Sequence, residues 1–244
     1  MAILLAWDAA GEKFYETGID RGVLFLYNST KVHDTNYVNG VAWNGLTQVT
    51  QSPSGAESNP IYADTIKYLD LRSNEEFGAT IEAYTYPDEF AECDGSAAVA
   101  DGVYISQQAR KKFGFTYRTR VGNDEDGDAH GYKIHLVYGC TAAPSEKAYQ
   151  TVNDSPEAIT FSWEVSTEPI PVGKINNVEY RPVAHLEIDS TKADSTKLAS
   201  FEEMLYGQAA SGSEEAIQAY MPLPAQVIAH FATSGSGEEE STNG

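Results

Sequence analysis

The sequence has few of the residues that usually carry covalent or nucleic-acid chemistry. Among its 244 residues only two are cysteines, Cys93 and Cys140, and only 16 are Lys or Arg against 36 Asp or Glu, a net charge of −20. Two isolated cysteines are too few for a disulfide framework or a recognisable metal site, so we expect free thiols. The shortage of cations argues against tight binding to nucleic acid, because affinity for a phosphate backbone comes from cations that displace its counterions.

Long apolar runs are also missing. No stretch approaches the about 18 apolar residues that a membrane helix needs. The short apolar run at residues 3–7 follows no Lys or Arg and ends at Asp8, which is not the pattern of a signal peptide. We therefore expect a protein that is made in the cytoplasm and has no membrane partner.

Strand patterns dominate what is present. The three Trp, fifteen Tyr and nine Phe residues exclude a wholly disordered chain despite the charge. Apolar and polar residues alternate over residues 159–165, 113–121 and 132–138, which is typical of strands with one buried face. The acidic, glycine-bearing run at 122–128 separates the last two segments and predicts an antiparallel hairpin with an acidic tip.

Further strands are expected upstream, together with one long loop. Residues 22–28 are almost continuously apolar and predict a central strand buried on both faces, and strands are also expected at 38–50, 66–71 and 79–86. A short helical turn should follow Pro87. Residues 51–65 are rich in Ser, Gly, Pro and Asn, and so long a loop is uncommon unless it binds something. The candidate contact residues between subunits are Gln51, Ser54, Gly55, Glu57, Asn59 and Tyr62.

The C-terminal third reads as a strand at 183–189, a polar turn and an amphipathic helix. Leu198, Phe201 and Leu205 fall on one helical face, with Ser195 as the expected cap and Gly207 as the stop. A final apolar run follows Pro224. We predict one mainly-β domain over residues 1–232, an antiparallel β-sandwich or partial barrel with one packed α-helix and a long assembly loop. Residues 233–244, which hold three consecutive Glu, should form a disordered acidic tail.

No motif indicates catalysis, and we expect no catalytic, cofactor-binding or metal-binding residues. The acidic run at 124–128 lacks the spacing of an EF-hand and is interpreted as a solvated hairpin tip. The histidines are scattered, and His185 should lie with Glu187 and Asp189 on the wet side of its strand in an exposed ion pair. A hydrolase that uses two of the many carboxylates stays open as an interpretation, although no pair stands out.

A carbohydrate-binding β-sandwich of a phage or bacterial surface protein is the alternative from another class. Five aromatic residues could line a sugar-binding face: Trp43, Tyr62, Tyr68, Tyr84 and Tyr86. Aromatic residues at strand spacing are more often core residues. This interpretation therefore ranks second.

Several segments resemble one known family. ITFSWEVSTEPI (159–170), HLEIDST (185–191), KLASFEEMLYG (197–207) and LPAQVIAHF (223–231), together with GVLFLYN (22–28) and the long loop, resemble the major tail tube proteins of long-tailed, siphovirus-like phages. The likeness covers most of the chain and depends on the order of whole segments rather than on a catalytic signature. The acidic tail is the one departure from the family pattern.

The resemblance implies a structural virion protein that assembles in the host cytoplasm into stacked hexameric rings. The rings would form the tail tube, the conduit for genome ejection, with DNA as a weakly interacting cargo. Its partners would be further copies of itself, the tape measure protein, the tail terminator and distal tail proteins. Carboxylates on wet strand faces are candidates for the lumen, namely Glu82, Glu164, Glu187 and Asp189.

Overall fold

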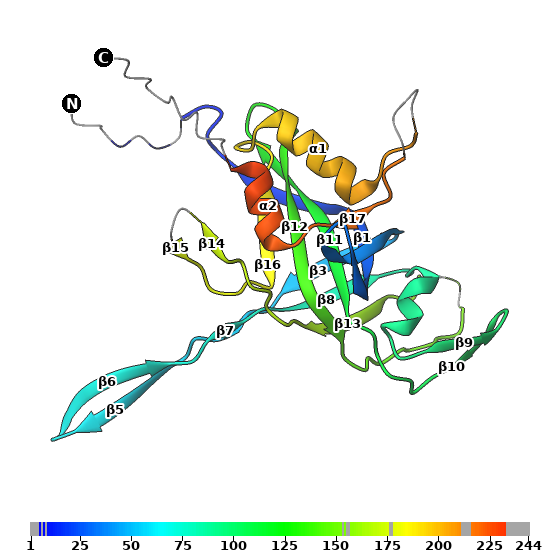
Figure 1. The fold of residues 1–244 in the computed structure, drawn as a ribbon, viewed down its shortest axis with the longest axis horizontal. Coiled ribbons are helices and arrows are strands. Elements are labelled where there is room, and N and C mark those ends of the chain that lie inside the picture. The colour runs from blue at the N-terminus through cyan, green and yellow to red at the C-terminus, as the bar shows by residue number, and fades with distance from the viewer. Residues whose placement is uncertain are drawn as a thin grey trace, which may run out of the picture.

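The computed structural model describes residues 5, 7, 9–152, 154, 157–175, 178–210 and 216–232. The acidic segment at 233–244, predicted to be disordered, lies outside the described residues. Within them the chain is mainly β with antiparallel strands, which confirms the predicted fold class (Figure 1).

The main sheet joins nine strands, and all of its pairings are antiparallel. Their order is β17 (Tyr220–Met221), β2 (Thr35–Trp43), β1 (Tyr15–Val32), β11 (Phe113–Asn123), β12 (Gly127–Ala142), β13 (Phe161–Ser166), β8 (Gly78–Ala83) and β3 (Leu46–Gln51), with β16 (His185–Asp189) also pairing with β12. The expected hairpin is β11 with β12. The strand expected at 38–50 is instead two strands, β2 and β3, which turn at Gly45 where φ is 78°.

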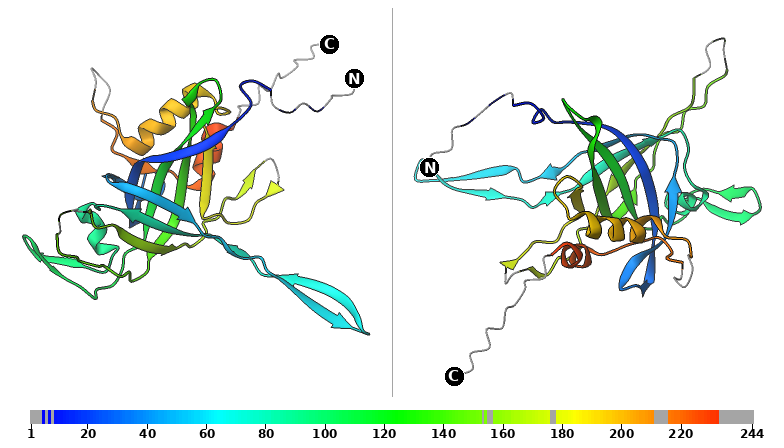
Figure 2. Two further views of the ribbon diagram at one scale, coloured as in Figure 1. Left: turned by 180° about the vertical axis from the view of Figure 1, so that it is seen from behind. Right: turned by 90° about the horizontal axis from the view of Figure 1, so that it is seen from above.

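Short two-stranded ribbons extend from this sheet. They are β4 (Ser54–Gly55) with β7 (Glu75–Glu76), β5 (Ser58–Ala63) with β6 (Ile66–Arg72), β9 (Ala97–Ala100) with β10 (Val103–Ile105), and β14 (Lys174–Ile175) with β15 (Val178–Glu179). The predicted helical turn after Pro87 is the 3₁₀ helix η1 (Asp88–Glu92). The β5–β6 ribbon projects far from the rest of the protein (Figures 1 and 2).

A bulge in β12 lets this strand serve two neighbours. Phe113 pairs with Cys140 and Phe115 with Val137, so β12 carries one extra residue between these pairs. Gly139 lies in the bulge with φ of 61°, a conformation that favours glycine. Before the bulge β12 pairs with β16, and after it β12 pairs with β13. The bulge therefore splits one edge of β12 between two partners.

The sheet buries side chains on both of its faces. The inner core lies between β1, β11 and β12 on one side and β8 and β13 on the other, and includes Leu24, Trp43, Ile81, Phe90, Phe113, Phe115 and Trp163. The outer core packs β1, β2, β12 and β16 against two helices, and includes Phe25, Ile134, Leu136, Tyr138, Phe201 and Leu205. Two buried faces explain why residues 22–25 lack alternation.

Both helices lie on one side of the sheet (Figure 2). Helix α1 (Ser195–Tyr206) buries Leu198, Phe201 and Leu205 as predicted, and Gly207 ends it with φ of 78°. The predicted cap Ser195 is wrong, because the Asp194 side chain accepts from the backbone N–H groups of residues 196 and 197. The expected apolar run is a second helix, α2 (Pro224–Phe231).

Replacing Gly139 tests the bulge. A Cβ at this position would lie 2.3 Å from the Glu168 carbonyl oxygen, whereas a Cβ at Gly102, where φ is also positive at 74°, would meet nothing within 4 Å. We expect Gly102→Ala to cost about 1 kcal/mol of unfolding free energy from backbone strain alone, and Gly139→Ala at least about 2 kcal/mol more. Urea denaturation of both variants measures the difference, and equal costs would contradict a tightly closed bulge.

Candidate assembly surface

The ribbon of β5 and β6, together with its neck β4–β7, replaces the predicted loop. We call residues 54–76 the arm. The strand predicted at 66–71 is β6, but the prediction of a loop at 51–65 is wrong, because residues 58–63 form a strand that pairs with 66–72 in a hairpin. Asp64 and Thr65 make its two-residue turn with φ of 50° and 65°, as in the type I′ turns that match the twist of paired strands. Pro, Gly and Asn in this segment had indicated loop rather than strand.

The arm has one apolar and one polar face. Cross-strand partners project from the same face of a ribbon, and Ile61 pairs with Leu69 while Asn59 pairs with Leu71. The other face carries Ser58 and Asp70. Between the Ile61–Leu69 and Tyr62–Lys67 pairs β6 carries one extra residue, a bulge. Because of this bulge Ile66 projects from the apolar face.

The polar side chains of the other face bond to one another. Asp70 accepts from the Ser58 hydroxyl and pairs with the Lys67 ammonium. Lys67 first, and Ser58 second, hold the pKa of the Asp70 carboxyl below its ordinary value. The arrangement marks this face as the one that suits water.

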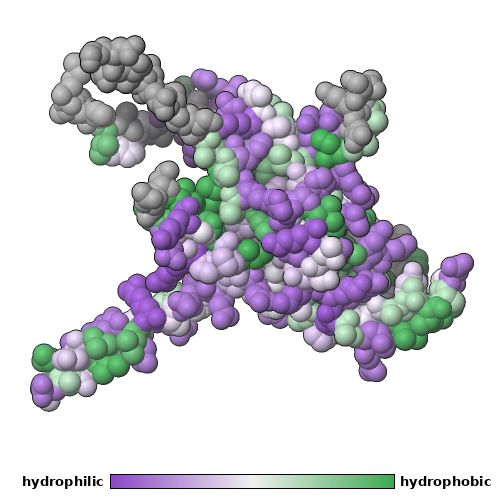
Figure 3. Space-filling view, viewed as in Figure 1, coloured by the Kyte–Doolittle hydropathy of each residue, from purple (hydrophilic) through white to green (hydrophobic). Residues whose placement is uncertain are grey.

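The apolar face has no cover within the chain. The exposed fractions of Ile61, Ile66, Leu69 and Leu71 are 40%, 63%, 38% and 52%. Hydrophobic side chains are visible along the projecting arm in Figure 3. An isolated two-stranded ribbon is only marginally stable in water. An ordered arm with a bare apolar face is therefore suited to packing against another surface.

The six candidate contact residues separate into two groups. Ser54, Gly55, Glu57, Asn59 and Tyr62 lie in the arm. Gln51 does not, because it ends β3 and its Nε2 donates to the Tyr117 Oη at 2.7 Å. Gln51 therefore belongs to the attachment of the arm.

Five side chains attach the arm to the sheet, and we call them the root cluster: Gln51, Phe77, Tyr117, His135 and His185. The Tyr117 ring stacks on His135 with centroids 4.5 Å apart, and the Phe77 ring stacks on His185 at 4.7 Å. Nδ1 of His135 lies 3.2 Å from Nε2 of His185. Gln51 and Phe77, which flank the two ends of the arm, thus contact side chains of β11 and β16, and His135 of β12 links these.

His135 is buried and His185 is half-buried between Phe77 and His135, which corrects the expectation of an exposed ion pair at His185. Burial, and second the charge of a protonated His185, lower the pKa of His135 to about 4. Burial also lowers the pKa of His185. Sequence reasoning missed this pair because 50 residues separate its members. Only the β12–β16 register, in which Val137 lies opposite His185 and His135 opposite Glu187, brings them together.

The four candidate lumen carboxylates lie on different surfaces. Glu82 and Glu164 project from β8 and β13 on the face opposite the buried Ile81 and Trp163. Glu187 and Asp189 lie on β16. The structure does not bring the four together.

The two acids of β16 have cationic neighbours. A carboxylate oxygen of Glu187 lies 3.1 Å from Nζ of Lys133, and one of Asp189 lies 3.1 Å from Nζ of Lys192. No ion pair involves Glu82 or Glu164 within the described part of the chain. These two acids keep the more open negative charge.

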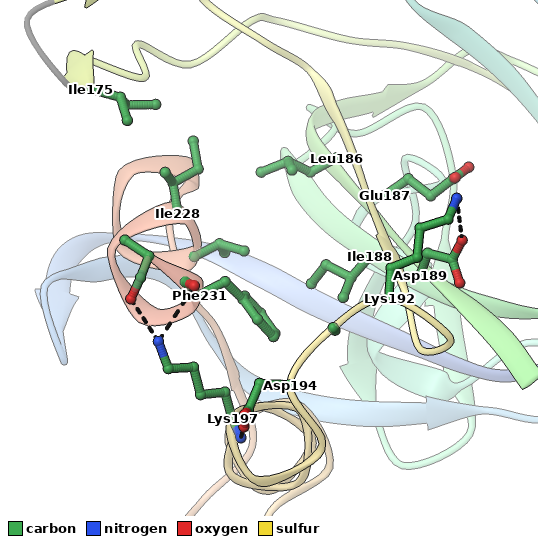
Figure 4. A pocket seen from close by; sticks show the side chains of 13 residues that line it. Ile175, Leu186, Glu187, Ile188, Asp189, Lys192, Asp194, Lys197, Ile228 and Phe231 are labelled. Atoms are coloured by element: carbon green, nitrogen blue, oxygen red, sulfur yellow. Dashed lines mark hydrogen bonds and ion pairs between the residues drawn. The ribbon is translucent and has the colours of Figure 1, made fainter. Parts of the chain in front are cut away.

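A groove of about 800 Å³ lies between α2 and β16. Figure 4 shows Leu186 and Ile188 of β16 on one side, Ile228 and Phe231 of α2 on the other, and Ile175 at one end. Lys192 and Lys197 lie at its rim. Among the described residues, the backbone of 185–188 forms hydrogen bonds only with β12, so the outer edge of β16 is open beside the groove.

The described residues offer little for reaction chemistry. Cys93 and Cys140 are free and buried, as predicted for free thiols, and burial raises the pKa of Cys93 to about 12. A thiol of such high pKa is a poor nucleophile at neutral pH. Among the described residues no group of three His, Cys, Asp or Glu side chains could hold a metal ion. No helix in the described ranges is long and apolar enough to cross a membrane.

Comparisons with known proteins give no family. The sequence matches no family model, and no curated protein matches it. Among solved structures, a chain of the anti-feeding prophage baseplate, determined by cryo-EM with 6-fold symmetry, is similar at 8% sequence identity and a TM-score of 0.34. The alignment covers 77% of this chain and 99% of that one. A likeness at this TM-score carries no argument.

The histidine pair should make stability depend on pH. Because the pKa of His135 is lower in the folded than in the unfolded chain, its neutral form stabilises the fold above about pH 6.5, and this stabilisation is lost as pH falls toward about 4. We expect about 2 kcal/mol less unfolding free energy at pH 4.5 than at pH 7 from this group. Urea denaturation across this range should show a shallower dependence for His135→Gln, whereas His130→Gln at the β11–β12 tip should keep the wild-type dependence.

Proposed function

We propose that the protein is a structural component of a phage tail that assembles with copies of itself through the arm. The observation that carries the proposal is the uncovered apolar face of a projecting, ordered hairpin. The resemblance of the sequence segments to major tail tube proteins supplies the context. In this proposal the protein is not an enzyme and acts as a building block of the virion tail.

The geometry of the contact favours rings or tubes over simple dimers. The arm extends from one end of the longest axis of the protein (Figure 1). If it packs against a different surface of the next copy, the interface is head-to-tail, and such contacts close into rings or continue as filaments. Stacked hexameric rings with a central channel for DNA are the form that we propose.

The charge suits a channel for DNA. With a net charge of −20 the protein repels the phosphate backbone, which allows DNA to slide through without binding. Glu82 and Glu164, which have no cationic partner within the described residues, are the candidates that we place at the lumen. The tape measure, terminator and distal tail proteins remain the proposed partners.

The groove beside β16 is the surface that we propose receives the arm. It offers apolar walls and an open strand edge at residues 185–188, while the arm brings an apolar face and the open edges of β5 and β6. An added strand gains main-chain hydrogen bonds from such an edge and specificity from alternate side chains. The contact would bury the apolar face and leave Asp70 and Lys67 in water.

The carbohydrate-binding alternative has less support. Of the five aromatic residues, Trp43 is 3% exposed and packs in the inner core with Tyr86 beside the same cluster. Tyr62 and Tyr68 are exposed on the arm, and Tyr84 is exposed elsewhere. The predicted aromatic platform is therefore divided between core and surface.

Matched double variants test the arm. Ile61→Thr with Leu69→Thr removes apolar area from the bare face, and Ser58→Thr with Arg72→Thr changes the polar face to the same residue type. We expect wild type and the polar-face variant to form rings or tubes, and the apolar-face variant to need at least about tenfold more protein, since 1.4 kcal/mol per contact corresponds to that factor. Light scattering and electron microscopy measure assembly, with circular dichroism as a folding control.

Two outcomes would contradict this proposal. Equal assembly by both variants would show that the apolar face takes no part in the contact. A wild-type chain that stays monomeric at all concentrations, even with tail-tip proteins added as initiators, would contradict self-assembly and bring glycan binding forward.

A cysteine cross-link tests the groove. Leu71→Cys on the apolar face of the arm and Ile228→Cys on α2 are made in separate chains and mixed under mild oxidation. If the arm of one copy lies in the groove of the next, we expect a covalent dimer that forms only in the mixture. Arg72→Cys, on the polar face, mixed with Ile228→Cys is the matched control and should give little product. Equal yields from both mixtures would place the arm elsewhere.

A further inference from the structure

The root cluster joins the two ends of the arm to each other through the sheet. Next to Gln51 and Phe77 the two segments that lead into the arm are joined, because the Ser52 N–H donates to the Gly78 carbonyl at 2.8 Å. Gln51 contacts Tyr117 on β11, and Phe77 contacts His185 on β16. His135 on β12 lies between and contacts both Tyr117 and His185. The arm therefore depends at both of its ends on the contact between two histidines.

The histidine contact is a hydrogen bond between rings that lie edge to edge. The ring planes differ by 13° and the centroids are 5.4 Å apart, yet His135 Nδ1 and His185 Nε2 are only 3.2 Å apart. One nitrogen must donate its N–H and the other must accept with a lone pair. On the far side of the ring, His135 Nε2 lies 3.0 Å from the Thr119 hydroxyl. A neutral pair fulfils these contacts.

Protons change this arrangement in two steps. One proton on the pair leaves an imidazolium that still donates to a neutral imidazole. A second proton places N–H groups on both facing nitrogens, so the hydrogen bond is lost and two positive charges face each other at short range. Burial of the rings also disfavours their charged forms.

The surrounding charged groups do not cancel this effect. Glu187 on β16 has an oxygen 3.8 Å from His135 Nδ1 and favours protonation, as does Glu16 on β1. Lys133 on β12 opposes protonation and also pairs with both carboxylates. Burial outweighs the two acids, so the pair is neutral at pH 7.

We propose that the His135–His185 pair is an acid-operated clamp on the root of the arm. Protonation of both rings separates them, withdraws the stacking partner of Phe77 and frees the arm at its neck while the two cores stay folded. The clamp itself is independent of assembly. Its consequence, that acid weakens contacts made through the arm, rests on the proposed function.

Hydrogen exchange of the full chain tests the clamp. The chain is kept dilute and unassembled, and exchange is measured by mass spectrometry from pH 7 to pH 4.5 with correction for the intrinsic rate. We expect protection of residues 52–57 and 73–78 to fall at least tenfold over this range, while α1 and the centre of β11 keep their protection. In His185→Gln and in His135→Gln the same segments should show less than a threefold change, and His130→Gln should behave as wild type.

Histidine ring signals in NMR give a second measurement on the unmodified chain, which decides the matter if either variant unfolds. The midpoint of ring titration for His135 and His185 should coincide with the midpoint of root opening. Three results would overturn the clamp. The protection of residues 52–57 and 73–78 could stay constant with pH, or it could fall in the His→Gln variants as much as in wild type. The midpoints of ring titration and of root opening could also differ by more than one pH unit. Because these experiments use unassembled chains, failure of tube formation leaves their outcome unaffected.

Discussion

The bulge at Gly139 decides which strands can pair with β12. A regular β12 would offer one continuous edge to one neighbour, but the extra residue lets β16 pair before it and β13 pair after it. The β16 portion stays with β1 and β11 beneath the helices. The β13 portion continues to β8 and β3, which close over the inner core. Two cores on opposite faces of one set of strands follow from this division.

The division also explains where the arm is attached. Residues 52–77 leave the sheet between β3 and β8, and Phe77 reaches the β16 portion through its stack on His185. The root cluster thus connects the part of the sheet that contains β16 with the part that contains β3 and β8, which separate at the bulge in β12. Polar and titratable side chains of the root cluster lie where these two parts meet, while Trp163 and Phe90 lie in the inner core.

Local signals in the sequence predicted the elements that local interactions determine. The β11–β12 hairpin follows from alternation around an acidic turn, and α1 follows from Leu198, Phe201 and Leu205 before Gly207. In the arm the strand at 66–71 was predicted, but β5 was missed because it contains Pro60 and Asn59 and the turn after it lacks glycine. The histidine pair was missed for another reason, since a contact across 50 residues depends on strand register, which no local pattern reveals. The positions of the candidate lumen acids depend on the fold in the same way.

The neck of the arm bears on the mechanics of any assembly built with it. The two strands of the described neck pair with each other at only two positions, Ser54 with Glu76 and Gly55 with Glu75, and Gly55 and Ala56 have φ of 83° and 54°. A ribbon two strands wide resists stretching along its length far more than it resists bending across it. Subunits joined in this manner would tilt against one another by flexing their necks while their packed interiors stay rigid. A long tube of such subunits would curve as a chain of stiff links, with compliance located at the joints and not in the walls.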